Sequence, residues 1–357
     1  MVVTTILGIL AVFSAYLTKY NGWKFGLKLS FSMIFIFLAL RYNFGNDYEP
    51  YLNVFNSINA KDQFKLFEFE TRVEIGWVGL CRLFKPLGFF AMTAFLSLLS
   101  CIVYYRFIKN YVPERYYWLA VFIYIFSPSF MLIHSSAMRQ SLAIVFFILS
   151  IDFILKRNLT KYLLCIGLSS LFHYSALILI PAFLLGFTRE KISNVLLVII
   201  FSLYLLLFVL IEQVGPIINQ IVSTHFHKYE HYEGAATIGS GLGVVYSSVL
   251  LILLLYFDRY QDKKHTLIFR IAAISFFFIP LAFYIQMIGR ISMYFAPATI
   301  VAYPMLQETF QKNIYKLLFI SLIILVTAYT YFQFYQSDVW KPYFFEYHTI
   351  FASPEIL

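Results

Sequence analysis

The chain has 357 residues, of which 61% are hydrophobic and only 13% are charged, and its mean hydropathy is +0.76. A soluble domain is typically about 45–50% apolar and about 25% charged. The composition therefore excludes a soluble enzyme, a disordered tail and a disulfide scaffold, and it indicates a polytopic membrane protein.

Long apolar runs recur from one end of the chain to the other. A spanning helix needs about 20 mainly apolar residues, and the sequence lacks the strand-like alternation with turn signals that is typical of an outer-membrane barrel. We predict an all-α polytopic membrane protein with about 12 transmembrane helices (about 10–12). The predicted spans lie near 1–17, 28–40, 89–106, 117–134, 138–155, 160–172, 174–187, 192–212, 243–257, 266–286, 291–307 and 314–334.

No linker, tandem repeat or shift in composition divides the chain. We predict one integral membrane domain over 1–357, with long non-membrane segments only at 41–88, 213–242 and 335–357. The three cysteines, Cys81, Cys101 and Cys165, are far apart and are read as buried small hydrophobes.

The basic residues predict the orientation of the spans, because loops rich in Lys and Arg stay in the cytoplasm. One set of loops carries 17 of the 27 basic and 6 of the 18 acidic residues, a net charge of +11. The opposite set carries 10 basic and 12 acidic residues, a net charge of −2. The basic set, which we expect to be cytoplasmic, lies near 18–28, 106–116, 152–161, 189–191, 258–270 and 308–316.

This orientation places both termini and all three long segments on the periplasmic or outer side. The first span has no basic residues before it, so we expect an N-out span rather than a cleaved signal peptide. The net charge of +9 is explained by topology rather than by nucleic-acid binding.

Several ionisable residues lie at the ends of spans on the less basic side. The rule that basic residues stay on the cytoplasmic side does not explain arginines there. These ionisable residues are Arg41 and Asp47 after the second span, Arg139 at the fifth, His173 between the sixth and seventh, and Arg290 at the eleventh. Ionisable groups near a membrane span usually either snorkel to the interface as anchors or carry function. The planar forks of three arginines suit phosphate or diphosphate oxygens. Asp47 is a candidate proton acceptor, and His173 is a candidate acid or base near neutral pH.

The three long segments are expected to cover this side. In 41–88, helical spacing after Asp47 and an amphipathic stretch after Glu74 predict a lid or an interfacial helix, with Glu74 and Trp77 facing sugar. In 213–242, His227 and His231 have metal-ligand spacing without a second ligand pair, so we predict a glycine-rich covering loop and no metal. The aromatic tail 335–357 is expected to pack back over the outer face.

Signatures of soluble nucleotide-dependent enzymes are missing. The sequence has no P-loop, no G-x-G-x-x-G after a strand, no zinc-spaced cysteine pair and no G-x-S-x-G. A cytoplasmic enzyme that uses ATP or a nucleotide sugar is therefore not expected.

Five short motifs, in order along the chain, resemble the EpsG family, the Wzy-type polymerases of O-antigen and exopolysaccharide. The motifs are Arg41-x-x-x-Gly45-x-Asp47-Tyr48, Glu74-x-Gly76-Trp77, Met138-Arg139-Gln140-Ser141, His173-Tyr174-Ser175 and Gly289-Arg290-x-x-x-Tyr294. The resemblance runs from about residue 30 to residue 300.

The resemblance implies a GT-C-like membrane glycosyltransferase of the bacterial inner membrane, active on the periplasmic face. Such an enzyme joins undecaprenyl-diphosphate-linked oligosaccharide repeat units by transferring the chain on one lipid to the sugar of a fresh lipid-linked repeat. It needs no cofactor, and it works with a flippase and a chain-length regulator. The products implied are lipopolysaccharide O-antigen or exopolysaccharide.

The resemblance also implies roles for residues in the motifs. Arg41, Arg139 and Arg290 would hold the diphosphate, and Asp47, His173 and Glu74 are the catalytic candidates, with the identity of the base left open. The candidate sugar contacts are Tyr48, Gln140, Tyr174, Trp77 and Tyr294.

Three alternatives remain at this stage. A lipid-linked polysaccharide ligase would share the diphosphate site and differ in its acceptor. A flippase or transporter would place charged groups along a pathway at mid-membrane, whereas the polar groups here cluster at span ends. A membrane O-acyltransferase would need a histidine reached from the cytoplasm, whereas His173 is expected near the outer face.

Overall fold

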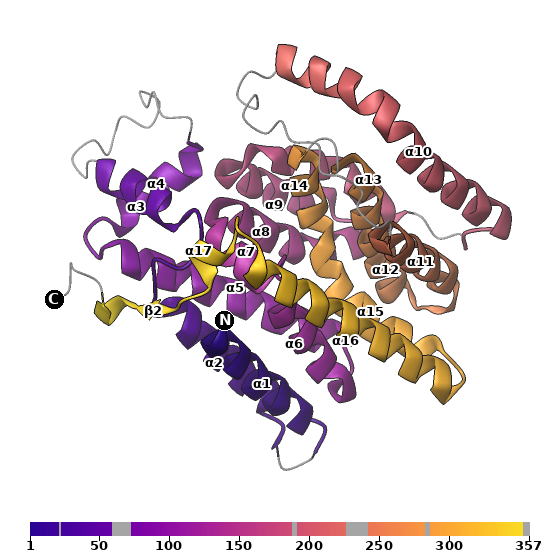
Figure 1. The fold of residues 1–357 in the computed structure, drawn as a ribbon, viewed down its shortest axis with the longest axis horizontal. Helices are drawn as coiled ribbons and strands as arrows, with labels where there is room; N and C mark the ends of the chain where they lie inside the picture. Colours follow the sequence, from indigo (N-terminus) through magenta and orange to yellow (C-terminus); the bar gives the residue numbers. More distant parts are fainter. Residues whose placement is uncertain (21–22, 59–72, 188–190, 226–241, 283–285, 353–357) are drawn as a thin grey trace. The chain divides into compact units, whose positions relative to one another are not determined.

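The computed structural model describes residues 1–20, 23–58, 73–187, 191–225, 242–282 and 286–352 (Figure 1). These residues form helices almost throughout, together with one two-stranded antiparallel sheet. The prediction of an all-α protein is confirmed at this level.

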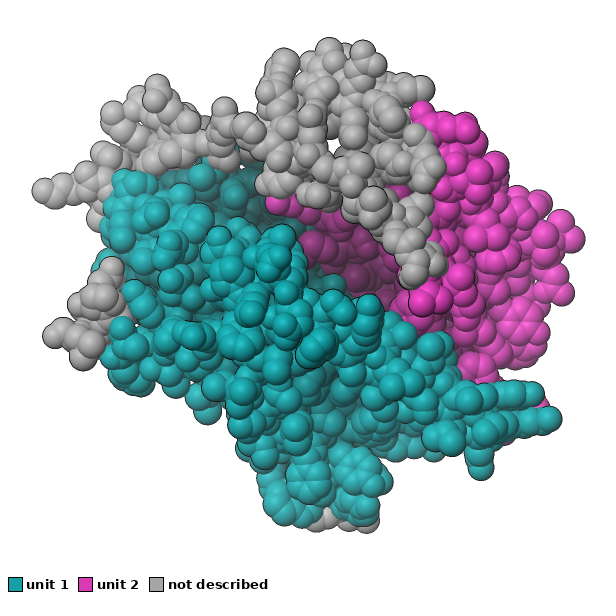
Figure 2. All heavy atoms as spheres, viewed as in Figure 1, with its two compact units in different colours: residues 1–153, 158–180, 312–357 teal, residues 154–157, 181–311 magenta. Residues whose placement is uncertain are grey.

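Contacts within the chain divide it into two compact units (Figure 2). Unit 1 contains residues 1–153, 158–180 and 312–357, and unit 2 contains residues 154–157 and 181–311. The sequence predicts a single domain over 1–357. Each unit is described separately below.

Five helices among the described residues are long and apolar enough to cross a bilayer. They cover Phe89–Tyr111, Met138–Leu155, Leu242–Tyr260, Lys263–Ala282 and Asn313–Gln336. Six further apolar helices are shorter: Val2–Leu17, Gly26–Ala39, Ile75–Phe84, Leu159–Phe172, Tyr174–Gly186 and Asn194–Leu210. The protein is therefore membrane-embedded, while the number of 12 spans stays a prediction.

Unit 1 begins with a helical hairpin, α1 (Val2–Leu17) and α2 (Gly26–Ala39), whose members pack side by side (Figure 1). Ser30 of α2 donates a hydrogen bond of 2.6 Å to the Ala11 carbonyl of α1. The other main helices of unit 1 are α3 (Tyr48–Ser57), α4 (Ile75–Phe84), α5 (Phe89–Tyr111), α6 (Tyr117–Phe126), α7 (Met131–Ser136), α8 (Met138–Leu155), α9 (Leu159–Phe172), α16 (Asn313–Gln336) and α17 (Lys341–Phe344).

A buried aromatic cluster joins four of these helices and fixes the frame of the candidate site. Tyr51 of α3, Trp77 of α4, Phe89 of α5 and Met138 of α8 belong to it. Helical spacing in 41–88 and after Glu74 predicts α3 and α4 correctly. Because aromatic side chains bury large areas, this cluster supplies much of the packing energy that holds α3 and α4 against the spanning helices.

The tail packs back onto the segment that follows α2, as the sequence predicts. β1 (Arg41–Tyr42) pairs with β2 (His348–Thr349) in an antiparallel ladder. The Gly45 amide donates to the Tyr343 carbonyl at 3.0 Å, and the ring of Tyr347 stacks on Phe37 with centroids 4.3 Å apart. The two segments, far apart in the sequence, form one local structure.

Unit 2 consists mainly of α10 (Asn194–His225), α11 (Leu242–Phe257), α12 (Lys263–Phe277), α13 (Ile279–Ala282), α14 (Gln286–Phe295) and α15 (Thr299–Thr309). Tyr204 of α10 donates to Ser247 of α11 at 3.1 Å, and Ser292 of α14 donates to the Ser275 carbonyl of α12 at 2.9 Å. Helix α10 extends beyond the predicted span 192–212 and enters the predicted loop 213–242, the rest of which lies largely outside the described residues.

Four predicted spans are interrupted or altered, each at or near a proline. The predicted span 117–134 breaks after α6 at Pro128, and the predicted span 174–187 forms a 3-10 helix that contains Pro181. The predicted span 266–286 divides into α12 and α13 beside Pro280, and the predicted span 291–307 divides at Pro297. Proline lacks the amide donor and disfavours the helical conformation in the residue before it, so a regular α-helix is interrupted there.

Candidate functional site

Three residues from three different motifs meet in unit 1. Arg139 at the start of α8 contacts Glu74 at the N-terminus of α4, with 2.5 Å between its guanidinium nitrogen and Oε2. Nδ1 of His173 at the end of α9 lies 3.4 Å from Oε1 of Glu74. The side chains of Arg139, Glu74 and His173 are 27%, 6% and 17% exposed. We call these three residues the Glu74 cluster.

Close packing of α4 on α9 brings Glu74 to His173. A Cβ atom at Gly76 would lie 2.6 Å from the Leu171 carbonyl oxygen, so only glycine allows this approach. Leu171 is two residues before His173, which caps the C-terminus of α9. The glycine in the Glu74-x-Gly76-Trp77 motif therefore has a geometric function.

An aromatic pair also packs beside Arg139. Nε of Arg139 lies 3.5 Å from the Tyr51 hydroxyl, and its guanidinium carbon lies 5.6 Å from the centre of the Tyr51 ring. Tyr51 in turn packs on Trp77 with centroids 4.9 Å apart. The guanidinium thus lies beside both a carboxylate and an aromatic ring, an environment that suits arginine better than lysine.

Glu74 is an ionised carboxylate in this cluster. Its burial raises its pKa, but the contact with His173 and the positive charge of Arg139 outweigh burial and lower the pKa to about 2. The negative charge balances Arg139, and Oε1 lies 3.4 Å from Nδ1 of His173.

Asp47 lies in a tightly held turn before α3. Gly45 has φ +120, and a Cβ atom there would lie 2.9 Å from the side chain of Ser136. The Asp47 amide donates to Ser136 Oγ at 3.0 Å, and Ser136 Oγ donates to Asn46 at 2.7 Å. Asn46 also donates to the Asp47 carboxylate at 3.0 Å. The turn is therefore fixed against the end of α7, with the Asp47 side chain half-buried.

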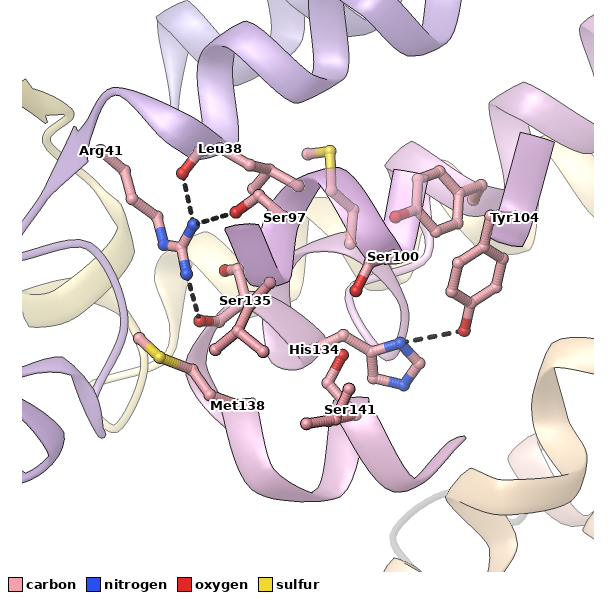
Figure 3. A pocket seen from close by; sticks show the side chains of 13 residues that line it. Leu38, Arg41, Ser97, Ser100, Tyr104, His134, Ser135, Met138 and Ser141 are labelled. Carbon is pink, nitrogen blue, oxygen red and sulfur yellow. Dashed lines mark hydrogen bonds between the residues drawn. The ribbon is translucent and has the colours of Figure 1, made fainter. Parts of the chain in front are cut away.

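Arg41 is buried inside unit 1, with 2% of its surface exposed. Its guanidinium donates to the Leu38 carbonyl, to Ser97 Oγ at 2.8 Å and to the Ser135 carbonyl at 3.2 Å, as Figure 3 shows. Burial lowers the pKa of Arg41 to about 10, which leaves it charged at neutral pH. In this structure Arg41 ties the end of α2 to α5 and α7.

A small cavity of about 20 Å³ adjoins Arg41, with room for about one water molecule (Figure 3). On its other side, Nδ1 of His134 lies 3.1 Å from the Tyr104 hydroxyl. The sequence predicts no role for Tyr51, Ser136 or His134, because polar and aromatic residues at span ends are common. Only the adjacency of Ser136 to the Met138-Arg139 motif indicates its involvement.

The predicted sugar contacts are mostly buried. Tyr48, Trp77 and Gln140 lie in the interior of unit 1, and Tyr294 is buried in unit 2. Tyr174 is 59% exposed at the start of the 3-10 helix Tyr174–Gly186. Sugar contact by these residues stays a prediction, and among the five only Tyr174 presents an open side chain.

Arg290 belongs to unit 2, on α14, and its side chain is half-buried. It lies one turn before Tyr294 on the same helix. Its role in holding a diphosphate stays a prediction.

Among the described residues no group of three or more His, Cys, Asp and Glu side chains has a geometry that suits a metal ion. His227 and His231, whose spacing alone does not predict a metal site, lie outside the described residues.

The chain matches the model of the EpsG family over residues 26–347. No curated protein and no solved structure matches the chain. The matched range includes every residue of the Glu74 cluster together with Asp47 and Arg290.

Proposed function

Because the chain belongs to the EpsG family of polysaccharide polymerase-like membrane proteins, we propose that it is a glycosyltransferase that polymerises polyprenyl-diphosphate-linked oligosaccharides. The donor is a sugar chain on undecaprenyl diphosphate, and the acceptor is a hydroxyl on the sugar of a second lipid-linked repeat. The product is O-antigen or exopolysaccharide, and the proposed architecture is GT-C-like.

The observation that carries the proposal is the Glu74 cluster. A partly exposed arginine, an ionised carboxylate and a histidine lie in contact at the ends of three helices. A diphosphate leaving group needs a cation, and an attacking hydroxyl needs a base. The cluster contains both kinds of group within one contact network.

The proposed reaction forms a bond between the acceptor oxygen and the anomeric carbon of the donor sugar. The bond from that carbon to the diphosphate oxygen breaks, and its electron pair leaves with the lipid diphosphate. Nε2 of His173 accepts the hydroxyl proton, while Glu74 holds the imidazole through Nδ1. Arg139 stabilises the charge that develops on the diphosphate.

Other residues take supporting roles in this proposal. Arg290 is a second diphosphate contact, and Asp47 orients the acceptor hydroxyl. Arg41 is a positioning residue, because its guanidinium is buried and bonded to three protein acceptors. Tyr174 is the first sugar contact, since it has the most exposed side chain of the predicted set.

The proposed location is the bacterial inner membrane, with the Glu74 cluster on the periplasmic side. Its support is the charge pattern, since the segments that carry Glu74, Arg139 and His173 adjoin the less basic loops. The proposed partners are the lipid-linked repeat itself, a flippase that delivers it and a chain-length regulator.

The test compares a strain lacking the protein with the same strain complemented by wild type, Arg139→Ala or Arg106→Ala at equal expression. Arg106 is an exposed arginine on α5 and serves as the matched control. We expect the deletion to leave single repeat units and wild type and Arg106→Ala to restore the polymer ladder. We expect Arg139→Ala to lower polymer synthesis about 10²–10³-fold, the cost of removing one charge-stabilising donor.

Purified protein supplied with lipid-linked repeats separates the alternatives. Polymer formed from repeats alone supports the polymerase. Transfer that occurs only onto a lipid A-core acceptor indicates a ligase, and translocation without a new glycosidic bond indicates a transporter. An unchanged ladder in the deletion strain overturns the proposal.

A further inference from the structure

Unit 2 contains a cavity of about 290 Å³ that the proposed reaction does not use. The end of α8, the end of the 3-10 helix Tyr174–Gly186, the turn Asp258–Tyr260 and the start of α12 form its walls. All of these belong to loops that the charge pattern assigns to the cytoplasmic side.

The lining of the cavity is strongly positive. Lys191, Arg259, Lys263 and Arg270 line it, and Asp258 is the one carboxylate among the described lining residues, which together carry a net charge of +3. Arg270 neutralises Asp258 through contacts of 2.9 Å from Nε and from a terminal nitrogen to Oδ2. Arg259 donates to the Ile192 carbonyl at 3.0 Å and Lys263 donates to the Leu155 carbonyl at 3.1 Å. Among the described residues no second carboxylate lines the cavity, so its positive charge exceeds its negative charge.

Two buried polar atoms in this lining are left without hydrogen-bond partners among the described residues, Oδ1 of Asp258 and Nε of Arg259. The first can only accept a hydrogen bond when ionised, and the second can only donate one. Leaving such buried atoms unpaired costs free energy. Both atoms are enclosed by protein and do not open into the cavity, so they place Asp258 and Arg259 in a tightly packed wall and do not specify the ligand.

Some sequence neighbours of the lining residues have large, exposed apolar side chains. Leu184 and Phe187 flank the lining residues Leu185 and Gly186, and Tyr260 follows Arg259; all three are exposed. A bound soluble anion would leave these apolar side chains exposed, whereas the acyl chains of a lipid would cover them.

We propose that this cavity binds the headgroup of an acidic phospholipid of the cytoplasmic leaflet. The phosphodiester lies on Arg259 and Lys191, the headgroup fills the cavity, and the acyl chains lie along Leu184 and Phe187. Phosphatidylglycerol carries such a phosphodiester and a single negative charge. Basic pockets between helices on the cytoplasmic side are typical binding sites for such headgroups.

The test is a titration of the purified full-length protein in neutral detergent with phosphatidylglycerol, phosphatidylethanolamine or inorganic phosphate, followed by thermal unfolding. We expect phosphatidylglycerol to raise the melting temperature in a saturable way and the other two probes to have little effect. The double variant Lys191→Gln/Arg259→Gln should bind phosphatidylglycerol about 25-fold more weakly, about fivefold for each charge removed.

The matched control is Lys156→Gln/Lys264→Gln, which removes two charges from the same set of loops outside the cavity lining. Wild-type affinity in this control supports the proposal. An equal loss in both double variants indicates a general surface effect and overturns it. A shift of the same size with inorganic phosphate alone shows a soluble-anion site and overturns the assignment to a lipid.

If the double variant does not fold, Lys191→Gln alone decides the question. Lys191 is exposed, so its removal leaves the packing of unit 2 intact. A loss of about fivefold in affinity for phosphatidylglycerol is then expected, and an unchanged affinity overturns the proposal.

Discussion

Glu74 serves two partners with one carboxylate, since Oε2 faces Arg139 and Oε1 faces His173. In the proposed reaction a diphosphate competes with Oε2 for the Arg139 guanidinium. Oε1 keeps its contact with His173 during that exchange, so the histidine stays oriented while the arginine moves to the leaving group. The partial exposure of Arg139 makes such an exchange sterically feasible.

The pKa of Glu74 predicts how stability depends on pH. Because the folded pKa is about 2 and the ordinary value is 4.5, the ionised carboxylate contributes about 3 kcal/mol to the free energy of unfolding above pH 4.5. This contribution is lost as the pH falls from 4.5 towards 2. Denaturation of wild type and Glu74→Gln in mild detergent at several pH values measures it, as the difference between the two curves.

Glu49→Gln is the control for this measurement, because Glu49 is an exposed carboxylate on α3 with one hydrogen bond of 2.9 Å from Asn43. Its effect should be within about 1 kcal/mol at every pH. A difference between wild type and Glu74→Gln that does not change between pH 5 and pH 2 would contradict the assigned ionisation.

At the scale of residues, the sequence predicts which residue types occur at the candidate site but not which of their side chains are exposed. Arg41 and Arg139 both stand at the ends of apolar segments and look alike in the sequence. The structure buries Arg41 against carbonyl and hydroxyl acceptors and leaves Arg139 partly exposed beside Glu74. Acceptors such as the Ser135 carbonyl belong to the backbone. Because every residue has a carbonyl, residue identity does not show which one accepts a hydrogen bond.

At the scale of elements, the contact between α4 and α9 determines the geometry of the Glu74 cluster. Gly76→Ala places a Cβ atom 2.6 Å from the Leu171 carbonyl oxygen. We expect α4 to shift away from α9, with a loss of about 1–3 kcal/mol of stability and reduced polymer synthesis. Thermal unfolding in detergent and the polymer ladder in cells measure the two effects.

Gly79 on the same helix is the matched control, because a Cβ atom there meets nothing within 4 Å. Gly79→Ala should be neutral or stabilising by about 0.5–1 kcal/mol, since alanine has the higher helix propensity. Equal effects of the two substitutions would show that the close approach of α4 to α9 is not required.

The tail is attached through the side chain of Tyr347 and through the backbone carbonyl of Tyr343. The Tyr347 hydroxyl donates to the Phe37 carbonyl at 2.6 Å, in addition to the stacking of its ring. Tyr347→Ala should release residues 343–350 at a cost of about 1–3 kcal/mol. Hydrogen exchange of the Gly45 and Ile350 amides measures the release.

Tyr343→Ala is the control, since the Tyr343 side chain is exposed and its contribution is the carbonyl that accepts from Gly45. Exchange at Gly45 should stay slow in that variant. Fast exchange in both variants would show that the tail is held by something other than the Tyr347 contacts.

Elements were predictable where apolar length and flanking residues agree, as for α1, α2, α8, α9 and α16. Prediction failed at Pro128, Pro181, Pro280 and Pro297, because hydropathy measures only the tendency to leave water. Pro304, in contrast, lies inside α15 without a break. The break between α6 and α7 at Pro128 is the most consequential case, since it creates the short helix that ends at Ser136 and holds the Asp47 turn.

For the whole molecule, the charge pattern predicts that the N-terminus and the tail lie on one side of the membrane. The Met1 amino group donates to the Phe345 carbonyl, which is consistent with a common side. Alkaline phosphatase fused after residue 357 should therefore be active, and green fluorescent protein fused there should be dark. Fusions after Lys312, in a basic loop, should give the opposite result, and a fluorescent C-terminal fusion would contradict the orientation.

The pairing of β1 with β2 also has a consequence for how the protein is made. Tyr347 is separated from its partner Phe37 by 310 positions, so the ribosome delivers the segment after α2 long before the strand that completes it. During synthesis the edge of β1 stays uncovered while the intervening helices enter the bilayer one after another. Closure of this ladder is therefore a late event of biogenesis, and a chain that stalls before residue 343 carries its Asp47 turn without the carbonyl that receives the Gly45 amide. Quality-control proteases would find such unfinished chains at that exposed edge.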